Sequence, residues 1–300
     1  MLKACYSPRY YARTHTNSME KLTAVADVLC KHKMVELIDP GLIDVEILKK
    51  LHNPQYVEAF LAGESAFATI QGFKPWNEQL RDAILSVQAG QLVGADIAFK
   101  EGIAANIAQG FHHASYESGA AYCTFNGLAL VAKQYPEKRI FVLDCDQHGG
   151  DGTAIFTNRL TNLVNFGIFG IRFGCKAGER SLTRYIHPKQ GNFDLYRESI
   201  FEAFQYASRW EADMIIYQAG MDCHQHDKYG SKWLTTELLF ERDRLVFDMA
   251  RKMKIPILFV LAGGYQVLED LVPLHVNTFK AANEVYFPRR FKSQVQHICN

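Results

Sequence analysis

The sequence predicts an α/β protein, built on one doubly wound parallel sheet with helices on both faces. Continuously apolar runs, such as residues 140–143 and Ile257–Leu261, alternate with helical patterns along the chain, and strands that are buried on both faces read as such runs. The hydrophobic content of 48% supports a large core, and no linker, low-complexity tract or internal repeat divides the chain. We therefore expect residues 1–300 to form a single domain.

The order of elements follows from these patterns. The expected strands are residues 2–6, 103–108, 140–143, 163–169, 214–218 and 257–261. Capping signals such as Asn53-Pro54 and Asn77 mark helix starts. The expected helices are residues 17–33, 44–51, 54–61, 77–100, 119–135, 194–210, 235–252 and a helix from about 152. Glycine and proline interrupt residues 65–76 and 172–192, which we expect to be irregular.

Composition excludes several classes of protein. The formal charge is +1, with scattered Lys and Arg, so direct nucleic-acid binding is not expected. No apolar run approaches the roughly 18 residues of a membrane span, and the N-terminus lacks a secretory signal. Seven cysteines without a C-x-x-C pair fit free thiols in a reducing compartment, and we interpret Cys145 and Cys223 as small apolar core residues. A cytoplasmic protein is expected, or a nuclear one if the source is eukaryotic.

Polar residues follow the apolar run 140–143 at once. Asp144, Asp146 and His148 would share one side if the chain stayed extended, and Asp151 follows after two glycines. Buried acids and imidazoles must be paired or bind a metal, because burying them alone costs much free energy. A catalytic zinc site needs three protein ligands and one open position, and this stretch can supply part of that set.

A third ligand can come from another strand end, since the carboxyl ends of parallel strands meet at one edge of a sheet. Asp222, which follows residues 214–218, is the first candidate. A helix cap or a structural ion pair is the simpler role for this residue taken alone. His224 and His226 are further candidates for the same position.

Two more strand ends carry candidate catalytic groups. His112-His113 follows residues 103–108, and Tyr265 follows two glycines. A histidine whose second nitrogen donates to a carboxylate suits a general base, and Asp144 and Asp151 are the acids available. A phenol such as Tyr265 can stabilise oxyanion charge, although an aromatic ring covering the core is an equally simple role.

Together these residues resemble the histone deacetylase family, within the wider group of arginase and deacetylase folds. The resemblance spans residues 50–270 in the family's order. The chain's length looks more like the short bacterial or class IV-like members. The matching motifs are Leu51-His52-Asn53-Pro54-Gln55-Tyr56-Val57, His112-His113-Ala114, Tyr122-Cys123-Thr124-Phe125-Asn126, Leu143-Asp144-Cys145-Asp146-Gln147-His148-Gly149-Gly150-Asp151-Gly152-Thr153, Ala219-Gly220-Met221-Asp222-Cys223-His224 and Ala262-Gly263-Gly264-Tyr265.

The resemblance implies a metal site. Asp146, His148 and Asp222 match the ligands of one catalytic zinc ion. Backbone oxygens of Asp144, Asp146 and His148 match ligands of a structural potassium ion. Gly167 stands where a serine side chain commonly helps to hold that potassium ion, so one of its usual ligands is missing from this sequence.

The resemblance also implies catalytic roles. His113 matches the general base that acts on the attacking water, with Asp151 behind it. His112 matches its electrostatic partner, backed by Asp144. Tyr265 matches the tyrosine that polarises the amide carbonyl. The implied reaction is hydrolysis of an acyl-amide bond.

A substrate channel is implied by the same comparison. Tyr122 stands where an aromatic residue lines the channel, and Ala121 replaces the glycine that usually precedes it. Gly110 and Phe111 stand in the family's segment before the two histidines. The opposite wall comes from residues 171–192, where Phe173 is the candidate.

The implied substrate is an acetylated, or longer acylated, lysine side chain in a protein. Acetylated polyamines or other small amides are the alternative, since residues 65–77 hold no aspartate of the kind that grips a peptide backbone in some members. A two-metal ureohydrolase such as arginase would need a second cluster of aspartates, and a catalytically weak scaffold protein would have lost some of these groups. The sequence predicts no particular oligomeric state.

Overall fold

The computed structural model describes residues 1–176, 178–230 and 233–288. Its centre is an eight-stranded sheet in the order β2-β1-β3-β8-β7-β4-β5-β6, and every neighbouring pair of strands is parallel. The strands are β1 (Leu2–Cys5), β2 (Val35–Ile38), β3 (Ile103–Gln109), β4 (Ile140–Asp144), β5 (Leu163–Phe169), β6 (Ser181–Tyr185), β7 (Met214–Ala219) and β8 (Ile257–Leu261).

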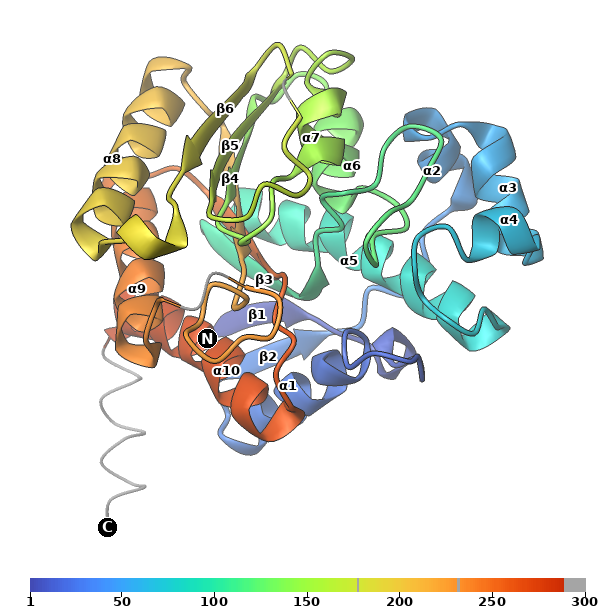
Figure 1. The fold of residues 1–300 in the computed structure, drawn as a ribbon, viewed down its shortest axis with the longest axis horizontal. Coiled ribbons are helices and arrows are strands. Elements are labelled where there is room, and N and C mark those ends of the chain that lie inside the picture. The colour runs from blue at the N-terminus through green and yellow to red at the C-terminus, as the bar shows by residue number, and fades with distance from the viewer. Residues whose placement is uncertain (177, 231–232, 289–300) are drawn as a thin grey trace.

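Helices cover both faces of the sheet (Figure 1). Helices α1, α10, α9 and α8 pack side by side on one face, and α5, α6 and α7 pack on the other, with α2 and α3 beyond them. The predicted fold class is therefore confirmed. The helices are α1 (Glu20–Lys31), α2 (Val45–Leu51), α3 (Pro54–Ala62), α4 (Ser65–Ala68), α5 (Glu78–Glu101), α6 (Gly127–Gln134), α7 (Asp151–Phe156), α8 (Phe193–Arg209), α9 (Thr236–Met253) and α10 (Leu268–Tyr286).

The helix expected over residues 119–135 was wrong in its first half. Helix α6 begins at Gly127, where the Asn126 side chain accepts the N–H of Ala129. Before it, Ala121 and Tyr122 have φ angles of 45° and 65°, in the left-handed region that a right-handed helix cannot contain. The alanine-rich composition of this stretch resembled a helix, but its backbone forms a loop at the site.

Other differences lie at the edges of the fold. β6 runs through the segment expected to be irregular, and α4 lies in the expected loop 65–76. β2 and α10 had no predicted counterpart. Helix α8 begins at Phe193 and is capped by the side chain of Asn192. Asp194 therefore lies inside the first turn and is not the cap. β2 and β6 are the edge strands of the sheet. Both are short and partly exposed, so neither has the continuous apolar run that marks a buried strand in a sequence.

Two expectations from composition can be compared with the described residues. No helix among them is long and apolar enough to cross a membrane. The cysteines among them are free thiols, with Cys145 and Cys223 buried. Cys299 lies outside the described residues.

The central strands bring the candidate residues together. β3, β8, β7 and β4 are consecutive neighbours in the sheet, and all of their residues are buried. Because these strands are parallel, their carboxyl ends lie along one edge of the sheet. The loops that leave this edge carry His112 and His113, Tyr265, Asp222, and the segment 145–150.

Candidate active site

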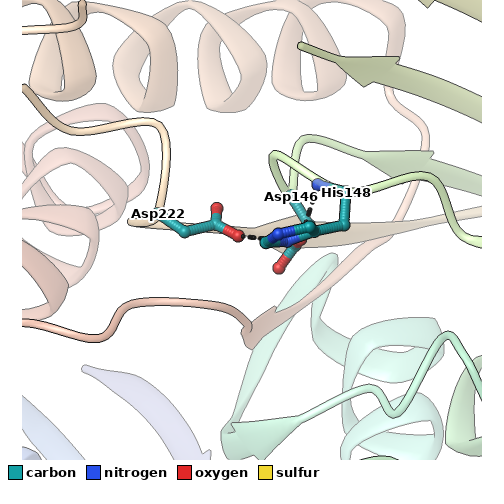
Figure 2. Close-up of side chains that lie close together, drawn as sticks. All are labelled: Asp146, His148 and Asp222. Atoms are coloured by element: carbon teal, nitrogen blue, oxygen red, sulfur yellow. Dashed lines mark hydrogen bonds and ion pairs between the residues drawn. The ribbon is translucent and has the colours of Figure 1, made fainter. Parts of the chain in front are cut away.

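A cluster of three side chains lies at the carboxyl ends of β4 and β7. The Nδ1 atom of His148 lies 3.2 Å from Oδ1 of Asp146 and 3.0 Å from Oδ2 of Asp222. Figure 2 shows Asp222 reaching toward the imidazole from its own loop, with Asp146 beside the ring. One possible ligand atom from each residue lies within 4.8 Å of the other two. The structure therefore brings together the residues expected to hold a metal.

The backbone fixes the orientation of both acids. The N–H of Gly263 donates to Oδ2 of Asp146 at 2.7 Å, and the N–H of Gln147 donates to Oδ1 of Asp222 at 2.9 Å. A Cβ atom at Gly263 would lie 2.3 Å from Oδ2 of Asp222, so only glycine lets the backbone pass this close to the carboxylates. Each acid thus keeps one oxygen directed at His148.

The charges of this cluster indicate a cation site. Burial and the nearby Asp146 charge raise the pKa of Asp222 to about 7, against the opposing effect of His148. Burial lowers the pKa of His148, but hydrogen bonds to Asp146 and Asp222 outweigh it and raise the value to about 11. Two buried acids this close repel each other unless a cation neutralises them. The donor set of one imidazole and two carboxylates fits a divalent metal ion.

Each of the paired histidines faces its own acid. His112 Nδ1 lies 2.8 Å from Oδ2 of Asp144, and His113 Nδ1 lies 2.7 Å from Oδ1 of Asp151. The two ring centroids are 4.0 Å apart. A carboxylate on Nδ1 holds the imidazole in one orientation and leaves Nε2 for chemistry.

The two imidazoles differ in proton affinity. Burial lowers the pKa of His112, but the charges of Asp144 and Asp146 outweigh it and raise the value to about 9. Burial and the neighbouring His112 charge lower the pKa of His113, and Asp151 only partly offsets them. Within one pair, His112 therefore holds its proton more tightly than His113 does.

A buried network supports the loop that carries these histidines. The Asn126 side chain donates to the backbone oxygen of Ala114 at 3.1 Å and to Oγ1 of Thr153 at 3.1 Å. The N–H of Asn126 in turn donates to Nε2 of His52 at 3.0 Å. The motifs around His52, His112, Asn126 and Thr153 are thus parts of one supporting structure, although they lie far apart in the sequence.

A cavity of about 290 Å³ leads to the cluster, lined by His113, Ala121, Tyr122, His148, Phe173, Tyr229 and Tyr265. Its walls are mainly aromatic. The Phe173 ring meets the rings of His113 and His148 edge-on, with centroids 5.2 and 5.9 Å apart. Tyr122 and Tyr265 face each other with centroids 6.4 Å apart. Of the residues expected at a substrate channel, Tyr122, Ala121 and Phe173 line this cavity.

Phe111 and Gly110, which were also expected at the channel, do not line this larger cavity. Phe111 lines a smaller cavity of about 30 Å³ that also borders His112 and Asp146. Gly110 is absent from the described lining of both cavities. Gly110 packs closely against Leu128 and Gln218. A Cβ atom at this position would lie 2.4 Å from a side-chain atom of each.

Three residues near the site were missed by sequence reasoning. Lys21, fully buried in α1, lines the smaller cavity and donates from Nζ to the backbone oxygen of Ala262 at 2.5 Å. Asp227 is buried beside Tyr265, and Tyr229 forms part of the wall of the larger cavity. No local pattern marks Lys21, but the closeness of Asp227 and Tyr229 to Asp222 in the sequence was a usable signal.

The other candidate ligands do not join the cluster. His224 bonds to Oγ1 of Thr236 and to the Gln266 side chain, and His226 is exposed. Asp146, His148 and Asp222 form the one group of this kind found among the described residues. A second metal cluster of the ureohydrolase type is therefore not seen in that part of the chain.

Comparisons with known proteins agree with this geometry. The sequence model of the histone deacetylase domain matches residues 15–279. An uncharacterized protein of Picosynechococcus is 28% identical, over 94% of this chain and 98% of its own length. The acetoin utilization protein AcuC of Bacillus subtilis is 25% identical, over 89% of this chain and 78% of its own length.

The fold has a close match among solved structures. The acetylpolyamine aminohydrolase of Burkholderia pseudomallei superposes with a TM-score of 0.78 over 95% of this chain and 99% of its own, at 16% identity. At this identity the likeness shows the arginase–deacetylase fold alone. The family model covers most of the chain, and this chain is therefore a hydrolase of the histone deacetylase family.

Proposed function

We propose that this protein is a zinc-dependent amidohydrolase that removes acetyl or longer acyl groups from lysine side chains of proteins. One observation carries the proposal: a buried Asp146–His148–Asp222 cluster lies beside two acid-backed histidines and a tyrosine, at the base of an aromatic cavity. The proposal takes residues 1–300 as one catalytic domain. The free cysteines support the expected cytoplasmic location.

Asp146, His148 and Asp222 would hold the zinc ion. When bound, zinc supplies Lewis-acid polarisation of the amide carbonyl and lowers the pKa of water. A nitrogen and two oxygen donors suit zinc, and the two acids need such a charge beside them. The expected structural potassium ion would rest on backbone oxygens of Asp144, Asp146 and His148, without a side-chain ligand from Gly167.

His113 would act as the general base. Its Nδ1 is engaged by Asp151, so Nε2 is the atom that can accept a proton from the attacking water and later pass it to the leaving amine. His112, held by Asp144, would stabilise the negative charge that develops beside it. The two roles differ because the charges of Asp144 and Asp146 raise the pKa of His112 to about 9, whereas burial and the His112 charge lower the pKa of His113, which therefore stays neutral and able to accept a proton.

Tyr265 would donate its hydroxyl hydrogen to the carbonyl oxygen as charge develops there. Its ring lies in the cavity wall, with its centroid 6.4 Å from that of His148. Burial and the charge of Asp146 raise the pKa of the phenol well above its usual range, so the hydroxyl keeps its proton at neutral pH. A protonated phenol is the form that can donate this hydrogen bond.

The lining of the cavity favours an acylated lysine side chain as substrate over an acetylated polyamine. The described lining residues are aromatic rings, imidazoles and one alanine, with no carboxylate among them. Such walls suit the uncharged methylene stem of acyl-lysine, whereas a polyamine carries further ammonium groups along its chain. Acetylated polyamines and other small amides stay as the second candidate, because residues 65–77 hold no aspartate of the kind that grips a peptide backbone in some members of the family. A weak scaffold protein would be expected to lack part of the cluster.

A substrate panel tests the proposal. The zinc-loaded protein should hydrolyse a fluorogenic acetyl-lysine peptide, and His113→Ala should lower turnover by roughly 100-fold or more without loss of zinc. Peptides with longer acyl chains and acetylated spermidine complete the panel. Faster hydrolysis of acetylated spermidine would favour the small-amine candidate. No hydrolysis of any of these substrates would contradict the enzymatic proposal.

A further inference from the structure

The loop between Asp222 and Gly230 contains a buried acid with no assigned role. Asp227 is 1% exposed, whereas its neighbours Lys228 and Tyr229 are exposed. The loop turns back on itself, since a Cβ atom at Gly230 would overlap the backbone oxygen of Asp222. A carboxylate buried in such a loop costs free energy unless hydrogen bonds compensate for the lost water.

Both oxygens of this carboxylate accept backbone hydrogen bonds. Oδ1 accepts the N–H of Tyr229 at 2.9 Å, and Oδ2 accepts the N–H of Tyr265 at 2.7 Å. Burial raises the pKa of the Asp227 carboxyl, while these two N–H groups oppose the rise. The acid is therefore bound to two different segments, the loop after β7 and the loop after β8.

The two tyrosines held in this way also meet through their side chains. Their rings pack edge to face, with centroids 5.2 Å apart and planes at 80°. Both rings line the cavity that leads to the metal cluster. Tyr265 lies after Gly264, whose φ of +150° gives the backbone a conformation that other residues rarely adopt. A fixed partner for the Tyr265 N–H therefore restrains a segment that its glycines leave adaptable.

We propose that Asp227 is a positioning residue, whose single carboxylate holds the backbones of Tyr265 and Tyr229 in fixed positions relative to each other. The role of Tyr265 at the carbonyl rests on the proposed function. The anchoring of both tyrosine N–H groups by Asp227 does not depend on it. A carboxylate can accept two N–H groups at once through separate oxygens. Asparagine has one acceptor oxygen, and its NH₂ group would face the second N–H, so one of the two bonds must be lost.

A double-mutant cycle separates this role from simple stabilisation. Asp227→Asn should lower kcat by roughly 10-fold or more, because small misplacements of a catalytic group cost up to about 100-fold, and zinc content should stay at the wild-type level. In a Tyr265→Phe background the same change should lower kcat by less than about twofold, since the hydroxyl to be positioned is gone. Asp270→Asn, an exposed acid at the start of α10, is the matched control with unchanged kcat.

Equal loss of kcat from Asp227→Asn in both backgrounds would overturn the inference, as would wild-type kcat in the single variant. Backbone hydrogen exchange in the zinc-loaded wild-type protein gives a test that needs no variant. The amides of Tyr229 and Tyr265 should both be protected far more than the amide of Lys228. Exchange of Tyr265 as fast as Lys228 would contradict the anchoring. Full activity of Tyr265→Phe alone would instead contradict the proposed catalytic role of that tyrosine.

Discussion

His113 and Asp151 face each other across 2.7 Å between Nδ1 and Oδ1, although they are 38 positions apart in the sequence. His113 lies in the loop after β3, and Asp151 is the first residue of α7. The N–H of Gly152 also donates to Oδ1 of Asp151, at 3.0 Å, which fixes the carboxylate. The acid therefore keeps the imidazole in one tautomer, with Nε2 as its proton acceptor.

Asp151→Asn should lower turnover of an acyl-lysine peptide by roughly 10- to 100-fold, because His113 would lose the carboxylate that fixes its orientation and supports its basicity. The variant should keep its metal, because Asp151 pairs with His113 and the N–H of Gly152 and is not part of the Asp146–His148–Asp222 cluster. Steady-state kinetics and metal analysis measure the two effects. Asp248→Asn in α9 is the control, because the Asp248 side chain is 42% exposed and pairs only with Lys252 among the described ion pairs. Wild-type turnover, or loss of metal, would show that Asp151 has another role.

Metal binding should depend on Asp222 and not on the histidines that follow it. Asp222→Ala removes one of the three converging ligands, so the purified protein should contain little metal. His226→Ala is the matched control from the same loop, and it should keep its metal because His226 is exposed and outside the cluster. Metal content by mass spectrometry decides between them. Loss of metal in His226→Ala with metal retained in Asp222→Ala would show that Asp222 is not the third ligand.

The fold should lose stability as the pH falls below 6.5, through His52. Burial lowers the pKa of His52 to about 4, and only the backbone oxygens beside it oppose the shift. Nδ1 pairs with the Ser115 oxygen and Nε2 accepts from Asn126, so a second proton would break the latter bond. The unfolded chain binds more protons between pH 6.5 and 4, so stability is complete above 6.5 and is lost as pH falls toward 4.

The size of this loss is on the order of 3 kcal/mol, from a shift of about 2.5 pKa units at 1.36 kcal/mol each. Urea unfolding at several pH values measures it. The slope of stability against pH gives the number of protons taken up on unfolding, and in His52→Asn this number should fall by about one over this range. An unchanged slope in a folded variant would mean that other groups cause the acid sensitivity.

Ala121→Gly should stabilise the protein. Ala121 has a φ of 45°, and an alanine in this region costs roughly 1–2 kcal/mol, whereas glycine adopts it freely. After the entropy cost of glycine is subtracted, a gain of about 0.5–1 kcal/mol is expected. Ala120→Gly is the matched control, since its φ is not positive, and it should destabilise. Destabilisation by Ala121→Gly would contradict the left-handed conformation.

Much of the fold could be predicted because its central strands are fully buried. β8 and the first four residues of β4 are continuous apolar runs, and β3, β5 and β7 are interrupted by only one or two polar residues each. Polar residues follow the ends of β3, β4, β7 and β8, which indicated a single site. The edge strands β2 and β6 gave no such run, since partly exposed strands mix polar and apolar residues. Residues 119–126 were misread because alanine and glycine suit both a helix and a tight loop, and only tertiary contacts decide between them.

The candidate site shows the same division. Asp146, His148 and Asp222 could be named from short motifs that link residue types to metal chemistry. Lys21 could not, because a lysine on a helix is usually solvated and only the packed structure shows it fully buried beside the site. The closeness of Asp227 to Asp222 in the sequence marks it as a neighbour of the site, but its hydrogen bonds to the backbone N–H groups of Tyr229 and Tyr265 appear only in the structure.

The most direct test of the central claim is restoration of activity by zinc. The protein is stripped with a chelator and titrated with Zn²⁺, while hydrolysis of an acetyl-lysine peptide is followed. Activity should be absent without metal and should rise in proportion to zinc, up to one ion per chain, in the wild-type protein but not in Asp222→Ala. Equal activity with and without zinc, or saturation at two ions per chain, would contradict a single metal centre formed by Asp146, His148 and Asp222.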